Sequence, residues 1–240
     1  MIKLITASER HEAKVGDWLI SNYLFSFADY YDPSNIQFGP LRVFNHEYLA
    51  PKSSFPAHPH SDMEVVIVVL SGELTHKDQL GNESKIQAGA VERITAGSGI
   101  TYTLSNESEE EELHLLQLWF LPNKRGLAPA FEQMDVEFLT VTKSLYPLVT
   151  GQKVLEDVVF MNSNSTVYYG SVSQGEELDF RTFKIRKTLL YVLTGTVIIN
   201  GVEADQCDHI RLEDQELITI HGSADATFIL VDVPAIEANF

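Results

Sequence analysis

The chain has 240 residues, of which 44% are hydrophobic, enough for one large domain or two of moderate size. It carries 34 acidic and 17 basic side chains, and because Lys and Arg do not cluster, this balance argues against a nucleic-acid partner. No apolar run approaches the roughly 20 residues that span a bilayer, and residues 1–12 lack the apolar segment of a signal peptide. We therefore expect a cytoplasmic protein without membrane contact, and the single cysteine, Cys207, fits a reducing compartment.

Short apolar runs, many with a period of two, dominate the pattern and predict strands. Residues 7–19 are compatible with one short helix. Residues 64–74 and 85–94 predict strands, and the Leu-Gly-Asn turn between them predicts a hairpin. Further strands are expected at 114–122, 188–201, 216–222 and 226–234. Many short strands at about ten-residue spacing are typical of a barrel or a sandwich.

The sequence also contains an internal repeat. The segment "VVIVVLSGELTHKD" is similar to "TLLYVLTGTVIING": each has an apolar strand, a Ser or Thr followed by Gly, and an outgoing strand. Two similar β units in tandem are the simplest explanation. We therefore predict an all-β protein of two domains, at residues 1–133 and 150–240, joined by a linker at 134–149.

Several separate motifs then occur in the order found in a known family. They are "TASERHEAKVGDWLISNYLFSFADYYDP", "GPLRVFNHEYLAP", "HPHSDMEVVIVVLSGELTHKDQLGN", "AGSGI" and "LHLLQLWFLPNKRGLAPAFEQ". Together they resemble the pirin family, whose members are two cupin (jelly-roll) barrels packed side by side. The likeness is dense over residues 1–133, and over 150–240 it rests mainly on "YVLTGTVIINGVEA". The resemblance implies a metal in the first barrel. It also implies quercetin oxidation in some members and transcriptional co-regulation in the vertebrate ones.

The family's metal ligands are a His-x-His pair and a later His-x-Glu pair. The first pair corresponds to His58 and His60, which are two residues apart and share a face if they lie in a strand. In the second pair, Tyr102 stands in place of the histidine and Leu104 in place of the glutamate. Leu104 has no lone pair, and Tyr102 coordinates a metal only after losing a proton whose usual pKa is about 10. Two of the four ligands that the resemblance implies are therefore missing.

Two other residues are candidates for completing this site. Glu64 has the same parity as His58 and His60, but on a straight strand it lies about 13 Å beyond His60, at ~3.3 Å per residue. It reaches a metal only if the strand bends or bulges, and is otherwise a structural carboxylate held by hydrogen bonds. His114 is a barrel histidine that we place near the site, either beside the metal or as a ligand.

The leading hypothesis is a pirin-like protein that binds a small molecule or has a regulatory role. Its first-barrel pocket would be lined by His58, His60, Tyr102 and Leu104 with Glu64 or His114. His58 and His60 would hold at most a weakly bound divalent transition metal, such as Fe, Ni, Zn or Mn. The expected ligand is a small aromatic molecule. The alternative is a quercetin 2,3-dioxygenase-like oxygenase with a substitute oxygen ligand from Tyr102 or Glu64, and a protein-partner module is a third possibility.

Overall fold

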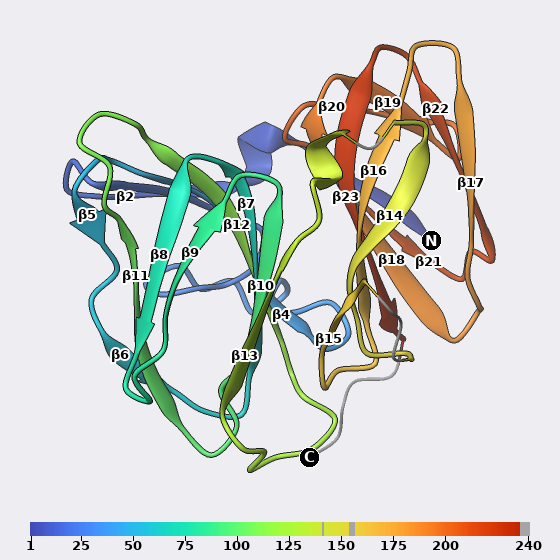
Figure 1. Ribbon diagram of the computed structural model, residues 1–240. Helices are drawn as coiled ribbons and strands as arrows, with labels where there is room; N and C mark the ends of the chain where they lie inside the picture. Colours follow the sequence, from blue (N-terminus) through green and yellow to red (C-terminus); the bar gives the residue numbers. More distant parts are fainter. Residues whose placement is uncertain (141, 154–156, 236–240) are drawn as a thin grey trace.

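The computed structural model describes residues 1–140, 142–153 and 157–235, and within them the fold is two β-barrels side by side (Figure 1). The first barrel has a sheet of order β13-β10-β7-β12-β4-β3-β2 facing a smaller sheet of order β5-β11-β8-β9, in which β6 also pairs with β11. Its strands are β2 (His11–Val15), β3 (Leu19–Tyr23), β4 (Leu41–Leu49), β5 (Ser53–Ser54), β6 (His58–His60), β7 (Glu64–Ser71), β8 (Glu73–Asp78), β9 (Glu83–Gln87), β10 (Ala90–Thr95), β11 (Ile100–Asn106), β12 (Leu113–Phe120) and β13 (Ala130–Asp135).

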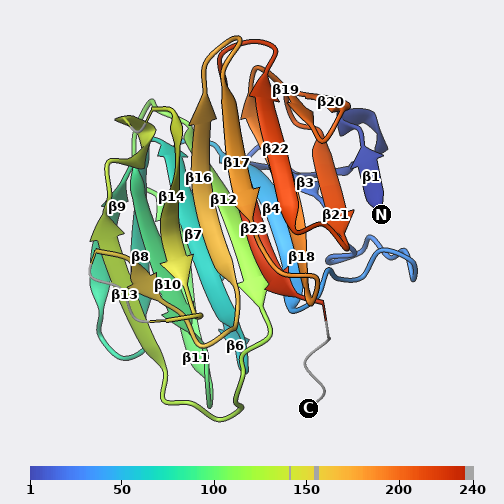
Figure 2. The ribbon, with the colours of Figure 1, turned by 90° about the vertical axis from the view of Figure 1, so that its right-hand side faces the viewer.

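The second barrel has a sheet of order β1-β21-β18-β23-β16-β14-β15 and a smaller one of order β17-β22-β19-β20 (Figure 2). Its strands are β1 (Ile2–Ile5), β14 (Ser144–Thr150), β15 (Val159–Phe160), β16 (Thr166–Val172), β17 (Glu177–Arg181), β18 (Arg186–Thr194), β19 (Thr196–Ile199), β20 (Val202–Asp205), β21 (His209–Glu213), β22 (Leu217–Gly222) and β23 (Ala226–Pro234). The described residues also form two short 3₁₀ helices outside the sheets, η1 (Ala7–Glu9) and η2 (Phe138–Thr140).

The two large sheets pack against each other, which explains why β7 is continuously apolar. Val65 and Ile67 face the interior of the first barrel, whereas Val66 and Val68 belong to the apolar layer between the barrels. All four side chains are fully buried. A strand that is buried on both faces has no solvent-facing positions, so it loses the usual polar alternation.

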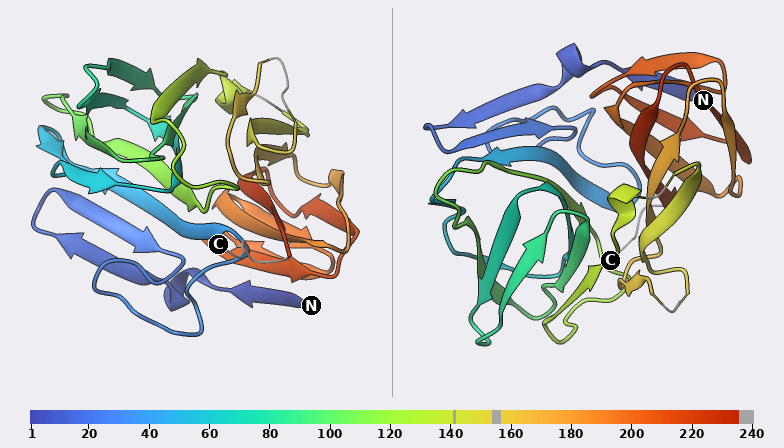
Figure 3. Two further views of the ribbon diagram at one scale, coloured as in Figure 1. Left: turned by 90° about the horizontal axis from the view of Figure 1, so that it is seen from below. Right: turned by 45° about the horizontal axis from the view of Figure 1, so that its top comes forward.

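The N-terminal strand joins the two barrels. β1 pairs with β21 of the second barrel, after which the chain crosses to β2 in the first (Figure 3). β14 starts at Ser144, within the segment expected to be a linker. The predicted domains, residues 1–133 and 150–240 with a linker at 134–149, account neither for β1 in the second barrel nor for β14 in the linker. These boundaries stay a prediction. No helix in the described part of the chain is long and apolar enough to cross a membrane.

A group of aromatic and imidazole rings lies at one end of the layer between the barrels. His46 contacts the Nε2 atom of His114 through its own Nε2, and its Nδ1 lies 2.5 Å from the Tyr191 hydroxyl. Arg10 donates to the same hydroxyl at 2.7 Å. Burial, helped by His114 and Arg10, lowers the pKa of His46 to about 3, and burial lowers the pKa of His114 to about 4.

This ring cluster predicts loss of stability in acid. Unfolded histidine has a pKa near 6.5, so below that pH the unfolded chain binds more protons than the folded one, and the free energy of unfolding falls as the pH drops from about 7 toward 4. We expect His114→Gln to flatten this dependence by up to about 3 kcal/mol. Urea denaturation at pH 7, 5.5 and 4.5 measures it. His11→Gln, on an exposed position of β2, is the control and should retain the parent's slope.

Candidate functional site

The His-x-His segment lies on β6, along the edge of the smaller sheet in the first barrel. In the register with β11, His58 is opposite Tyr102 and His60 is opposite Ile100. The rings of His58 and His60 are 4.3 Å apart between centroids, as expected for alternate residues on one strand face. The Nδ1–H of His58 donates to the Pro56 carbonyl at 2.7 Å, which leaves its Nε2 with a free lone pair. His60 Nε2 is buried without a hydrogen-bond partner among the described residues.

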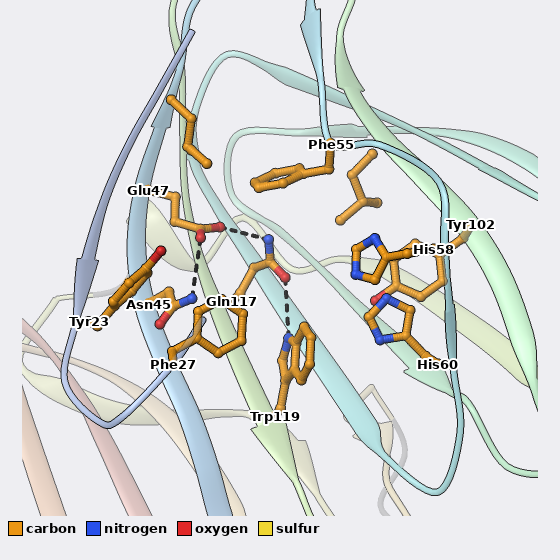
Figure 4. A pocket seen from close by; sticks show the side chains of 12 residues that line it. Tyr23, Phe27, Asn45, Glu47, Phe55, His58, His60, Tyr102, Gln117 and Trp119 are labelled. Atoms are coloured by element: carbon orange, nitrogen blue, oxygen red, sulfur yellow. Dashed lines mark hydrogen bonds between the residues drawn. The ribbon is translucent and has the colours of Figure 1, made fainter. Parts of the chain in front are cut away.

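These histidines line a cavity of about 210 Å³ inside the first barrel (Figure 4). Its walls are mostly apolar and aromatic, with polar groups on two opposite sides. The lining residues are Leu19, Tyr23, Phe27, Asn45, Glu47, Phe55, His58, His60, Tyr102, Leu104, Gln117 and Trp119. An apolar cavity with a few placed polar groups is typical of a small-molecule site.

The side chains of Tyr102 and Leu104 point from β11 into the barrel, as the alternation of side chains along a strand predicts. The Tyr102 ring stacks on His60 with 4.5 Å between centroids and 12° between planes. Burial, reinforced by Glu92 and Glu47, raises the pKa of the Tyr102 phenol, so it stays neutral at physiological pH. Leu104 is 2% exposed and offers only hydrocarbon to the cavity.

The residues present do not match the four-ligand metal set that the family resemblance implies. Among residues 1–140, 142–153 and 157–235, no three His, Cys, Asp or Glu side chains are grouped so that they could hold a metal ion. His58 and His60 supply two imidazoles, and the neutral Tyr102 phenol is a poor third donor.

Glu64 does not line the cavity, so its expected place in the pocket is corrected. It is fully buried at the start of β7, where it accepts hydrogen bonds from the backbone of Asn162 at 3.0 Å and from Thr95 at 3.2 Å. Asp62, with φ of 48°, turns the chain between His60 and Glu64, so the strand parity is not continuous between them. Glu64 therefore links the two barrels through hydrogen bonds. It has the structural role that was expected if it did not bind a metal.

His114 is likewise absent from the cavity lining, which corrects the second expectation. On β12 the side chains of Leu115 and Gln117 face the barrel interior, whereas His114 faces the second barrel and contacts His46. His114 therefore lies on the opposite side of the sheet from the cavity that His58 lines, since neighbouring strand residues point to opposite faces.

A buried carboxyl that the sequence analysis missed lies on the wall opposite the histidines. Glu47, on β4, is 2% exposed and accepts hydrogen bonds from Ser21 at 2.8 Å and Gln117 at 2.6 Å. Asn45 donates to it at 3.4 Å. Burial raises the pKa of Glu47 to about 7, against these three hydrogen bonds, which act to lower it. The signal in the sequence was a run of three polar residues, 45–47, in the middle of β4.

A second buried ionic group lies behind Tyr102, outside the cavity lining. His76 Nδ1 is 3.0 Å from a Glu92 oxygen, and its Nε2 is 3.7 Å from Asp78. Burial acts to lower the pKa of His76, but the two carboxylates outweigh it and the pKa is raised. Each nitrogen faces a different carboxylate, so this group is an ion-pair network that supports the ring of Tyr102, 5.6 Å away between centroids.

Two jelly-roll barrels packed through their larger sheets, with a His-x-His strand opening onto the first interior, define a two-barrel cupin protein. The family model "Pirin" matches residues 6–120, and the model "Quercetinase C-terminal cupin domain" matches residues 148–233. The chain belongs to the pirin family.

Similar proteins cover nearly the whole chain. "Quercetin 2,3-dioxygenase" of Escherichia coli strain K12 is 34% identical over 236 residues, covering 98% of this chain and all of the relative. A "Pirin-like protein" of Caulobacter vibrioides is 35% identical over 215 residues, with 90% and 92% of the two chains covered. The crystal structure of YhhW from Escherichia coli superposes with a TM-score of 0.93 at 32% identity, with 99% of each chain covered. The structure of bacterial pirin YhhW with nickel(II) gives 0.92 at the same identity, with 98% and 100% covered.

Proposed function

We propose that the chain binds a small aromatic molecule in the first-barrel cavity and that His58 and His60 hold a transition metal only weakly. One observation carries the proposal: the interior positions of β11 present a neutral phenol and a hydrocarbon, Tyr102 and Leu104, beside an aromatic-walled cavity. Removal even of groups that only support metal ligands lowers metal affinity about 10–100-fold, and loss of two direct ligands lowers it further.

The cavity walls support binding of a flat ring. Phe27, Phe55 and Trp119 supply aromatic surface, and aromatic pairs gain about 0.5–1.5 kcal/mol beyond the burial of their area. The free lone pair of His58 Nε2 provides an acceptor for a ligand hydroxyl group on one side of the cavity.

The second candidate is a metal-dependent oxygenase that uses His58 and His60 with a substitute ligand. It is favoured by the relatives named quercetin 2,3-dioxygenase and by the nickel(II) complex of YhhW. The partners of Glu64 and the raised pKa of Tyr102 weigh against either residue as the substitute. A protein partner also stays a prediction.

One titration with quercetin separates binding from turnover. The chain has two tryptophans, so Trp18→Phe leaves Trp119, on the cavity wall, as the reporter. We expect quercetin to quench Trp119 fluorescence to the same extent with and without EDTA. We also expect an oxygen electrode to record no quercetin-dependent oxygen uptake after loading with Ni(II), Fe(II) or Mn(II). Rapid oxygen uptake that His58→Ala abolishes would establish the oxygenase instead.

A further inference from the structure

The carboxyl of Glu47 is buried without a countercharge. Its hydrogen-bond partners are Ser21, Asn45 and Gln117, all neutral. No Lys or Arg lines the cavity in the part of the chain that the structure describes. These three neutral donors compensate the buried carboxylate only in part, since burial still raises the pKa of Glu47, so a bound cation would stabilise this wall further.

The same wall has hydrogen-bond acceptors in excess. Asn45 Oδ1 is buried and has no hydrogen-bond partner among the described residues, while its Nδ2 donates to Glu47 at 3.4 Å. The Oε2 atom of Glu47 accepts from Gln117 and keeps a second lone pair. A ligand group placed here must therefore donate hydrogen bonds.

Three aromatic rings surround this end of the cavity. Tyr23 and Phe27 are 5.1 Å apart at 69°, and Phe27 and Trp119 are 5.4 Å apart at 88°, so neighbouring rings are steeply inclined (Figure 4). The indole N–H of Trp119 donates to the side-chain oxygen of Gln117 at 3.2 Å, which fixes the ring. Aromatic faces of different orientation around one point are the arrangement that binds organic ammonium ions, at about 0.5–2 kcal/mol per contact.

We infer that the Glu47 end of the cavity recognises an ammonium group, either a primary or a methylated amine, carried on an aromatic or short aliphatic body. The inference rests on the proposed function, since it assigns a ligand class to the same cavity. The ammonium would donate to Glu47 and lie against Phe27 and Trp119. The formal net charge of −17 also favours the approach of cations over anions.

A pair of ligands of matched shape tests this assignment. Dissociation constants of 2-phenylethylamine and 2-phenylethanol are measured at pH 8 by the fluorescence of Trp119 in the Trp18→Phe chain. We expect the amine to bind at least about tenfold more tightly than the alcohol. Glu47→Gln should remove this preference while changing the affinity for the alcohol less than about twofold. Phe27→Leu should weaken binding of the amine about two- to fivefold, and binding of the alcohol less.

Glu203→Gln, on an exposed position of β20, removes one negative charge far from the cavity and should leave both constants unchanged. Equal binding of amine and alcohol by the parent would overturn the inference, as would an undiminished amine preference in Glu47→Gln. Should Glu47→Gln fail to fold, the parent's preference and the Phe27→Leu series decide the question. Quercetin binding without amine binding would refute this inference and leave the proposed function standing, whereas failure of all three ligands would refute both.

Discussion

Replacing Tyr102 by His together with Leu104 by Glu is expected to raise the affinity of the first barrel for nickel(II) at least about 100-fold. Both positions line the cavity, and Tyr102 is paired in register with His58. The double variant would therefore place three imidazoles and one carboxylate around one point, a set suited to divalent transition metals.

Isothermal titration with nickel(II) after chelator treatment gives the affinities of the parent, the two single variants and the double variant. Each single substitution should recover only part of the gain. Adding His58→Ala to the double variant should remove most of it. A double variant that binds nickel no more tightly than the parent would show that positions 102 and 104 do not face the two histidines.

The second large effect is on stability. Arg186, 6% exposed, contacts the carboxylate of Asp232 through its Nε and donates to the backbone oxygens of Asp232 and Asn164, both at 3.1 Å. Thr182 donates to Asp232 at 2.8 Å. Arg186→Met leaves a buried carboxylate without its positive partner. We expect it to lower the free energy of unfolding by about 3–5 kcal/mol, as measured by chemical denaturation at pH 7.

A double variant and a surface pair provide the controls for this prediction. Arg186→Met with Asp232→Asn removes both charges and should recover part of the loss. Lys184→Met breaks a pair with Glu216 whose side chains are 73% and 59% exposed, and it should change stability little. A loss below about 1 kcal/mol in Arg186→Met would mean that the buried pair contributes little to the fold.

The strands were predictable because, along most of the chain, apolar runs marked the strands and turn residues marked where they end. The strands expected around 64–74 and 226–234 are confirmed as β7 with the start of β8 and as β23. Of the short helix that residues 7–19 could hold, a single 3₁₀ turn forms, η1 (Ala7–Glu9), whereas most of the segment forms β2, a turn and the start of β3. Pairing of β2 with β3 outweighs the weak helical pattern, and Gly16, with φ of 56°, permits the tight turn between the two strands.

The site was predictable where one strand or one motif contains the residues. Parity placed His58 and His60 together, and the family order located Tyr102. Glu64 was misplaced because a turn at Asp62 interrupts the parity. Glu47 was missed because its role depends on Gln117, 70 positions away, and a polar residue in a strand does not by itself reveal which face is buried.

A crystal structure of the parent chain soaked in nickel(II), with anomalous data, tests the central claim most directly. That claim is that the first barrel retains two of the family's four metal-binding side chains. We predict an ion bound by His58 and His60 alone, at partial occupancy and completed by water. A fully occupied ion held by four protein side chains would contradict it.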